Sequence, residues 1–257
     1  MRIASLGSGS KGNATVIQTD NTCVLVDCGF NLKQCRQRLS NLGLSPADID
    51  AIFVSHEHSD HIGGVYKLAK HYDISVYMTQ GTAEGSRFDD FDRVNIIDAE
   101  TTFLVGDISV QPVVVPHDAR EPCQFIFSGN GYSFGILTDV GCITPHIEKQ
   151  YTACDALLLE FNHDVDMLAN GPYPEMLKQR VGGDYGHLNN HQAIGLLNAI
   201  DLEKIQHLLI AHISEKNNSI DSVLGCLNMQ LPLMDHQKIH FIDQKHGLDW
   251  RFIGRTN

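Results

Sequence analysis

The sequence has little of what would mark a membrane, secreted or polycationic protein. No stretch approaches the roughly 18 consecutive apolar residues that a membrane-spanning helix needs, and the first residues hold no apolar run long enough for a signal peptide. The seven cysteines are an odd number and include no Cys-x-x-Cys spacing. These absences argue against a membrane protein and a disulfide framework, and they predict reduced thiols in a cytoplasmic protein.

Positive charge is also scarce, with 19 lysines and arginines against 31 acidic residues and a formal net charge of −12. Such a chain is ill suited to wrapping nucleic acid non-specifically. A nuclease is not excluded, because two divalent ions would add about four positive charges where the phosphate binds. Since the 257 residues contain no linker-like, low-complexity or repeated segment, we expect one domain over residues 1–257.

One short stretch is crowded with side chains that bind metals. The apolar run 51–54 predicts a buried strand, and it is followed by His56, His58, Asp60, His61 and a Gly-Gly pair. His56 and His58 can face one position while the strand geometry lasts, and Asp60 and His61 can point at a second position after the chain turns. Imidazole and carboxylate are both ligands of divalent metals. An exposed loop that is rich in histidine by chance is the alternative, but the complete pattern at a strand-to-helix junction favours a metal site.

More histidine and aspartate side chains follow other predicted strands directly. Ligands from distant positions converge only if their strands share an edge in sheets that pack together. Asp27 belongs to an Asp-x-Gly turn and is expected to orient the metal-ligand loop from behind, although such turns are also common without that role. The candidates of this kind are Asp27, His117, Asp139 and His212.

The order of predicted elements indicates the fold. Strands come first, and alternating helices and strands follow, twice, which suits an α/β, four-layer αββα sandwich of two mixed β-sheets with helices outside. Residues 79–92 are expected to form a helix and an acidic loop, and residues 165–186 a loop with a short helix that could act as a lid. The expected strands are 2–6, 15–18, 23–27, 51–54, 74–78, 108–115, 124–127, 132–137, 156–161, 205–211 and 238–243, and the other expected helices are 31–42, 45–48, 65–71, 144 onward, 189–200 and 219–228.

Together these residues resemble the metallo-β-lactamase fold along nearly the whole chain. Four segments, residues 8–13, 159–164, 186–190 and 212–218, are similar to the YycJ/WalJ branch, whose members are regarded as DNA-directed phosphodiesterases. That branch is related to ribonuclease Z and to the cyclic phosphodiesterase of phosphonate metabolism. The chain lacks the long inserted domain of the CPSF/β-CASP nucleases and the extended arm of ribonuclease Z, which weakens substrate inference from those relatives.

The resemblance implies two divalent metal ions, zinc or manganese with iron as a further option. It places His56, His58, His117 and Asp139 on the first ion, and Asp60, His61, Asp139 and His212 on the second, with Asp139 as the bridge. A water that bridges the ions would be the nucleophile of a phosphodiesterase or DNA exonuclease. The partner would then be nucleic acid, DNA rather than RNA, or another phosphodiester.

Proton transfer and substrate binding are assigned on the same basis. Asp60 is counted with the catalytic residues, and either His187 or His163 is expected to bind phosphate or protonate the leaving oxygen. The alternative for each histidine is a helix cap or a loop hydrogen bond, and for the Gly/Ser loop 7–14 it is a plain hairpin turn. The expected substrate contacts are Ser8, Ser10, Lys11, Asn13, Asn162, Lys216 and Asn217.

Two rival functions use the same ligands. Hydrolysis of a cyclic phosphodiester, lactone, thioester or β-lactam needs the same activated water, so the metal ligands do not separate these reactions. A non-catalytic binding protein with a structural metal is the other rival. Structural zinc sites are closed by four ligands, whereas seven candidates are present here, which favours an enzyme.

Overall fold

The computed structural model describes residues 1–86, 88 and 91–254. Its internal contacts divide the chain into two compact units. Unit 1 comprises Met1–Val114, Ala119–Tyr132 and the chain from Ile242 onward, and unit 2 comprises Val115–Asp118 and Ser133–Phe241. The units interleave along the sequence, and a single domain over 1–257 stays a prediction.

The first sheet lies wholly in unit 1 and is mixed. Its strand order is β14-β1-β2-β3-β4-β5-β6. Strands β14, β1, β2 and β3 pair antiparallel, whereas β3, β4, β5 and β6 pair parallel. The strands are β1 (Arg2–Gly7), β2 (Ala14–Gln18), β3 (Cys23–Val26), β4 (Ala51–Phe53), β5 (Ser75–Met78), β6 (Val94–Ile96) and β14 (Leu248–Phe252).

A three-stranded antiparallel ribbon packs on this sheet within unit 1. It consists of β7 (Phe103–Val105), β8 (Ile108–Val114) and β9 (Cys123–Gly129). The contact is aromatic: the ring of Phe53 in β4 lies 5.5 Å from that of Phe125 and 5.4 Å from that of Phe127, between centroids. Tilted and edge-on rings at such distances are favourable beyond their buried area, so this cluster fixes β4, the strand that leads into the His56–His61 motif.

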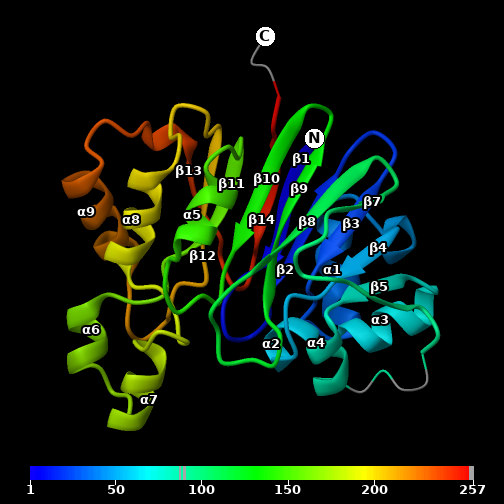
Figure 1. The fold of residues 1–257 in the computed structure, drawn as a ribbon, viewed down its shortest axis with the longest axis horizontal. Coiled ribbons are helices and arrows are strands. Elements are labelled where there is room, and N and C mark those ends of the chain that lie inside the picture. The colour runs from blue at the N-terminus through cyan, green and yellow to red at the C-terminus, as the bar shows by residue number, and fades with distance from the viewer. Residues whose placement is uncertain (87, 89–90, 255–257) are drawn as a thin grey trace. The chain divides into compact units, whose positions relative to one another are not determined.

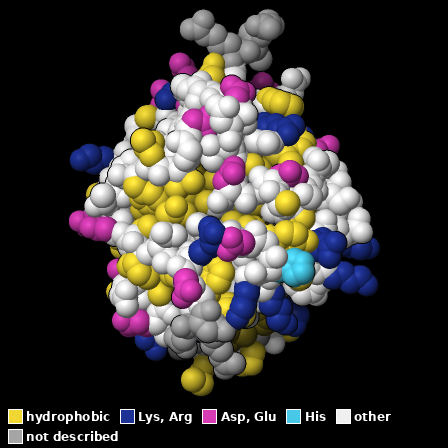
Figure 2. Space-filling model, turned by 90° about the vertical axis from the view of Figure 1, so that its right-hand side faces the viewer, with side chains coloured by type: hydrophobic (Ala, Val, Ile, Leu, Met, Phe, Trp, Pro, Cys, Tyr) yellow, Lys and Arg dark blue, Asp and Glu magenta, His cyan; other side chains and the backbone are white. Residues whose placement is uncertain are grey.

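The helices of unit 1 begin where the sequence supplies a cap. Asn31 forms a capping box with Gln34 at the start of the first helix, and its Cys35 and Leu39 are buried in the core. In Figure 2, several Lys and Arg side chains gather at the lower right of the face shown, while acidic side chains are scattered over its upper and left parts. The helices are α1 (Leu32–Asn41), η1 (Pro46–Asp48), α2 (Ser59–Ile62), α3 (Val65–Tyr72) and α4 (Gln80–Gly85).

Unit 2 is built on parallel strands with helices between them. The strands β10 (Tyr132–Leu137), β11 (Ala156–Glu160), β12 (His207–Ala211) and β13 (Ile239–Phe241) pair in parallel. Figure 1 shows α6 and α7 at the lower left, below α8 and α9 of the same unit. The helices are α5 (Pro145–Tyr151), α6 (Val165–Asn170), α7 (Glu175–Val181), α8 (Asn190–Ala199), α9 (Ile220–Gln230) and η2 (His236–Lys238).

The second sheet has the order β13-β12-β11-β10-β9-β8-β7, so both sheets are mixed and seven-stranded. Helices accompany both sheets, and the predicted αββα fold class is confirmed. Asn130 and Gly131 both have positive φ, +54° and +80°, as a tight two-residue hairpin turn requires. Among the described helices, none is both long and apolar enough to cross a bilayer.

The structure differs from the sequence prediction in a few elements. Strands β6, β7 and β14 were not predicted, and residues 165–186 contain two helices, α6 and α7, instead of one short helix. A separate one-turn helix, α2, begins inside the histidine motif. Helix α4 confirms the helix expected in 79–92, while Asp89 and Asp90 of the expected acidic loop lie outside the described residues.

Candidate metal centre

The His56–His61 motif of unit 1 follows β4 and forms two pairs of converging ligand atoms. His56 Nε2 lies 3.0 Å from His58 Nδ1. The chain then turns into α2, where His61 Nε2 lies 3.6 Å from Asp60 Oδ2. His56 and His61 are buried, whereas His58 and Asp60 are half-buried, so each pair combines a fixed imidazole with a more accessible ligand.

Asp27 and Ser55 orient the buried imidazoles from behind. The Asp27 carboxylate accepts hydrogen bonds from Ser55 N and Ser55 Oγ, both at 2.8 Å. Its Oδ2 also lies 2.8 Å from His61 Nδ1, and Ser55 Oγ lies 2.9 Å from His56 Nδ1. Because each Nδ1 has a partner in this network, Nε2 is the nitrogen presented as a ligand. The sequence placed Asp27 in this region, but gave no signal for Ser55.

The Gly/Ser loop contacts the same motif. Asn13 donates its backbone N–H to Asp60 O at 2.8 Å, and its side-chain Nδ2 lies 3.0 Å from His61 Nε2. Two glycines allow this close packing, because a Cβ on Gly29 would lie 2.0 Å from Asp60 O and one on Gly64 would lie 1.8 Å from Phe30 O. Asn13 therefore braces Asp60 and His61.

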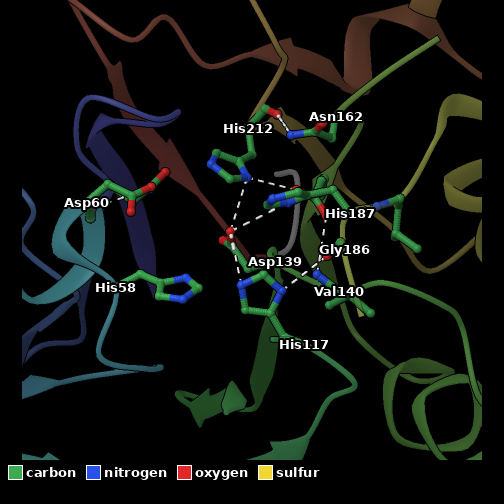
Figure 3. A network of polar contacts seen from close by, with 12 residues as sticks. His58, Asp60, His117, Asp139, Val140, Asn162, Gly186, His187 and His212 are labelled. Atoms are coloured by element: carbon green, nitrogen blue, oxygen red, sulfur yellow. Dashed lines mark hydrogen bonds and ion pairs between the residues drawn. The ribbon is translucent and has the colours of Figure 1, made fainter. Parts of the chain in front are cut away.

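In unit 2 the site residues come from separate elements and gather around one carboxylate. Asp139 Oδ1 lies 4.0 Å from His117 Nε2, 3.6 Å from His187 Nδ1 and 3.5 Å from His212 Nδ1, as Figure 3 shows. Asp139 lies two residues beyond β10 and His212 directly follows β12. Gly186 O accepts a hydrogen bond from His117 Nδ1 at 3.1 Å, which turns His117 Nε2 toward Asp139.

Three of the proposed site residues adopt left-handed backbone conformations. Asp27, Asp139 and His212 have φ values of +58°, +56° and +53°, and each lies at or just beyond the end of a strand. A non-glycine residue in this region costs on the order of 1 kcal/mol or more, and such strain concentrates at functional sites. The reversal turns the chain sharply as it leaves the sheet, which is a shared feature that sequence spacing does not reveal.

Glu160 joins two histidines of unit 2, and no role was assigned to it from the sequence. It ends β11 and is fully buried. Its Oε1 accepts hydrogen bonds from His187 Nδ1 at 2.8 Å and from His212 Nδ1 at 2.7 Å. Its Oε2 accepts the backbone N–H groups of Val140 and Leu188 at 3.3 and 3.2 Å. Glu160 thus fixes both rings with the Nδ1 side turned inward.

The charges in this cluster depend on one another. Burial opposes the ionisation of Glu160, but the charges and hydrogen bonds of His187 and His212 outweigh it and lower the pKa of Glu160 to about 2. Burial likewise opposes protonation of His187, yet the charge and hydrogen bond of Glu160 raise the pKa of His187 to about 9. Burial lowers the pKa of His117. In the unit 2 cluster, the charged form of Glu160 and the protonated form of His187 therefore favour each other.

The donor atoms of both units fit divalent metal ions. Two ligands bound about 2.0–2.1 Å from a tetrahedral ion lie about 3.3 Å apart, close to the 3.0 and 3.6 Å separations in unit 1. In unit 2, ligand atoms of Asp139, Glu160, His187 and His212 all lie within 4.8 Å of one another. Imidazole and carboxylate are the donor types that zinc, manganese and iron share. The clusters of both units are thus suited to binding metal.

The expected proton donors and substrate contacts occupy different environments. His187 is half-buried and hydrogen-bonded to Glu160, whereas His163 is buried and its Nδ1 has no hydrogen-bond partner among the described residues.

The expected substrate contacts also differ in exposure. Asn162 donates to His212 O at 3.1 Å, and Asn217 is wholly buried. Ser8 is buried with its hydroxyl 3.0 Å from Asn13 Oδ1, Ser10 and Lys11 are exposed, and Lys216 lies over the ring of Tyr173. Their roles toward a substrate stay predictions.

Comparison with known proteins covers most of the chain. Residues 22–213 match the family described as "Beta-lactamase superfamily domain". The chain is 34% identical over 219 residues to exodeoxyribonuclease WalJ of Streptococcus pneumoniae serotype 2 (strain D39), which covers 83% of this chain and 81% of that protein. It is 33% identical over 226 residues to exodeoxyribonuclease YycJ of Bacillus anthracis, covering 85% and 84%.

Comparison with solved structures indicates the same fold. The metallo-β-lactamase fold protein YhfI of Bacillus subtilis superposes with a TM-score of 0.74 over 98% of this chain and 99% of that one, at 15% identity, which is evidence for the fold alone. Family match, sequence relatives and fold agree with the histidine and aspartate clusters at the strand ends. This chain belongs to the beta-lactamase superfamily and has the metal-dependent hydrolase fold of that family.

Proposed function

We propose that this protein is a metal-dependent phosphodiesterase that degrades DNA as an exonuclease. The observation that carries the chemistry is the Asp139–Glu160–His187–His212 cluster, in which an aspartate adjoins two imidazoles aligned by one buried glutamate. The observation that supports a DNA substrate is the likeness to two exodeoxyribonucleases over more than four fifths of the chain.

We propose that the ligands of both units serve one binuclear centre, as family membership implies. His56, His58, His117 and Asp139 would hold one ion, and Asp60, His61, Asp139 and His212 would hold the other. Zinc and manganese fit this donor set best, and iron fits it as well. When bound, such ions supply Lewis acidity and a water acidic enough to attack a phosphodiester near neutral pH.

The protein's own residues would supply position and a proton. His187 is the stronger candidate for the proton donor, because Glu160 holds its Nδ1 and its side chain is 22% exposed. The carboxylate of Glu160 favours the protonated ring, which can hold a phosphate oxygen or protonate the leaving oxygen. His163 is buried, so access favours His187. Among the substrate contacts, the exposed Ser10, Lys11 and Lys216 are the best placed for phosphate.

The test is degradation of 5′- and 3′-labelled single- and double-stranded DNA and RNA, with zinc or manganese added and metal content measured on the same sample. We expect stepwise shortening of DNA. His187→Ala should retain bound metal and lose turnover by about 10²–10⁴-fold, while the control His146→Ala, an exposed histidine of α5, should match the wild type. Turnover of a lactone or thioester with no DNA degradation under either metal would contradict the proposal.

A cytoplasmic location is also part of the proposal. Fractionation of cells that express the protein tests it.

A further inference from the structure

A small pocket in unit 2 adjoins the proposed proton donor. Its volume is about 160 Å³, and its walls include Tyr173, Leu177, Arg180 and His187. Tyr173 precedes α7, while Leu177 and Arg180 belong to that helix. None of the substrate contacts predicted from the sequence lines this pocket. Because His187 belongs both to this wall and to the Glu160 cluster, whatever fills the pocket touches the catalytic cluster.

The pocket wall offers the aromatic ring of Tyr173 and the Arg180–Asp118 ion pair, and Lys216, which is not part of the wall, lies over the Tyr173 ring. Lys216 Nζ lies 5.6 Å from the centre of the Tyr173 ring. Arg180 Nε lies 2.5 Å from Asp118 Oδ2, an ion pair that fixes the guanidinium and leaves its terminal nitrogens able to donate to an anion. An aromatic face with Arg and Lys beside it is the arrangement by which proteins bind unpaired nucleotides.

The volume limits what the pocket can hold. At about 30 Å³ for each water of liquid volume, 160 Å³ corresponds to about five waters, enough for one ring system and too little for a base pair. Leu177 and Val181 supply apolar wall on the side of α7. A flat, uncharged ring can pack against the apolar wall, and an anionic phosphate attached to that ring can pair with Arg180 and Lys216.

We propose that this pocket receives the unpaired base of the nucleotide next to the scissile phosphate, with the base stacked on Tyr173 and the adjoining phosphates held by Arg180 and Lys216. The inference rests on the proposed function and adds to it that the substrate end must be single-stranded when it binds. A duplex end must fray before its base can enter, because the pocket holds one base.

Tyr173→Ala tests the pocket, with Tyr173→Phe as the conservative variant and Tyr185→Ala as the matched control. Tyr185 is an exposed tyrosine of the same segment that does not line the pocket. On a single-stranded oligonucleotide the metal-loaded Tyr173→Ala protein should show a KM raised about 10- to 100-fold, the range that base–aromatic stacking supports. Tyr173→Phe should stay within about threefold of the wild type, because it keeps the stacking face.

A second substrate separates stacking from a structural effect. In an oligonucleotide that is abasic at both terminal nucleotides, the ratio of KM between Tyr173→Ala and the wild type should fall below about threefold, since there is no base to stack. If this KM ratio is equal on the two substrates, or if KM on the ordinary oligonucleotide is unchanged, the pocket does not bind the base. Either result would leave the exonuclease assignment intact. A wild-type protein that degrades neither oligonucleotide with zinc or manganese would overturn both.

Discussion

The two ligand clusters, one in each unit, are built in opposite ways. In unit 1, four candidate ligands occur within six residues, His56 to His61, on the loop after β4 and the one-turn helix α2. In unit 2, His117, Asp139 and His212 come from segments far apart in the sequence, and a buried carboxylate aligns His212 with His187. The first cluster is specified locally, whereas the second depends on the whole sheet being formed. The comparison indicates that unit 2 is where single substitutions should have the widest effect.

The largest expected effect is that of Asp139→Ala. If Asp139 bridges two ions, its removal weakens both sites, so metal content should fall from about two ions per chain to below one, and kcat by about 10³-fold or more. His58→Ala removes a ligand of one ion only and should leave about one ion per chain. Metal analysis of dialysed protein and nuclease assays measure both quantities. Asp166→Ala, which changes an exposed aspartate of α6, is the control. Equal loss of metal in the Asp139 and His58 variants would contradict a bridging role for Asp139.

Glu160→Gln should have the next largest effect. The amide keeps the size of the side chain, but it cannot accept from both imidazoles with the strength of a carboxylate. Loss of such orienting partners typically costs about 10–100-fold in metal affinity or activity. Because His187 loses its partner along with His212, we expect kcat to stay low even when excess metal restores full occupancy. Full recovery of kcat at saturating metal would show that Glu160 acts through His212 alone.

Asp27→Asn is the corresponding change in unit 1 and should be milder. Asp27 contacts His61 and Ser55, and neither is proposed to transfer a proton. The variant should therefore bind metal about 10–100-fold more weakly and recover near wild-type kcat once metal is in excess. Activity measured against metal concentration tests this. A kcat that stays low at saturating metal would mean that Asp27, like Glu160, affects turnover beyond metal binding.

The same contrast explains what the sequence predicted and what it missed. The histidine motif and Asp27 were readable because apolar strands end directly in polar ligands. Glu160 was not, because a glutamate at the end of a buried strand carries no spacing signal, and its partners lie 27 and 52 residues away. The left-handed backbone of Asp139 and His212 is equally silent in the sequence.

The missed strands share a physical cause. Strands β6, β14 and β7 lie at edges of their sheets, and none has a fully buried residue within it. These edge strands with half-exposed side chains lack the continuous apolar run or clean alternation by which a strand is recognised. The edge strand β13 was predicted because Ile239 and Phe241 alternate with His240. The central strands β3, β4 and β11 are buried throughout and were predicted.

Metal addition should stabilise the protein. For each ion that binds only the folded state, a free concentration of 100 times Kd adds about 2.7 kcal/mol. At about 2–4 °C per kcal/mol for a chain of this size, the melting temperature should rise by about 5–10 °C for each ion bound. Thermal melts in chelator and in zinc or manganese measure this shift. His58→Ala and His212→Ala should each reduce it, and an unchanged melting temperature in the wild type would contradict metal binding to the folded state.

The two units also differ in how deeply their cysteine side chains are buried. The described thiols of unit 1 are all buried, whereas Cys142 and Cys226 of unit 2 are half-buried and Cys154 is buried. Burial raises the pKa of Cys23 and of Cys154 to about 12. It also raises the pKa of Cys142 and Cys226, which slows their reaction without blocking access. The buried cysteines of unit 1 are Cys23, Cys28, Cys35 and Cys123.

The smallest expected effect is therefore a slow, partial thiol reaction. Native protein treated with Ellman's reagent at pH 8 should release colour for about two thiols, and the rate should rise with pH because the thiolate is the nucleophile. The Cys142→Ser/Cys226→Ser variant should release almost none, while denaturant should expose all seven cysteines of the wild type. Peptide mapping then locates the label. Labelled Cys28 or Cys123 in native protein would mean that unit 1 opens on the timescale of the assay, and that its compact ligand loop is less rigid than the dispersed cluster it was compared with.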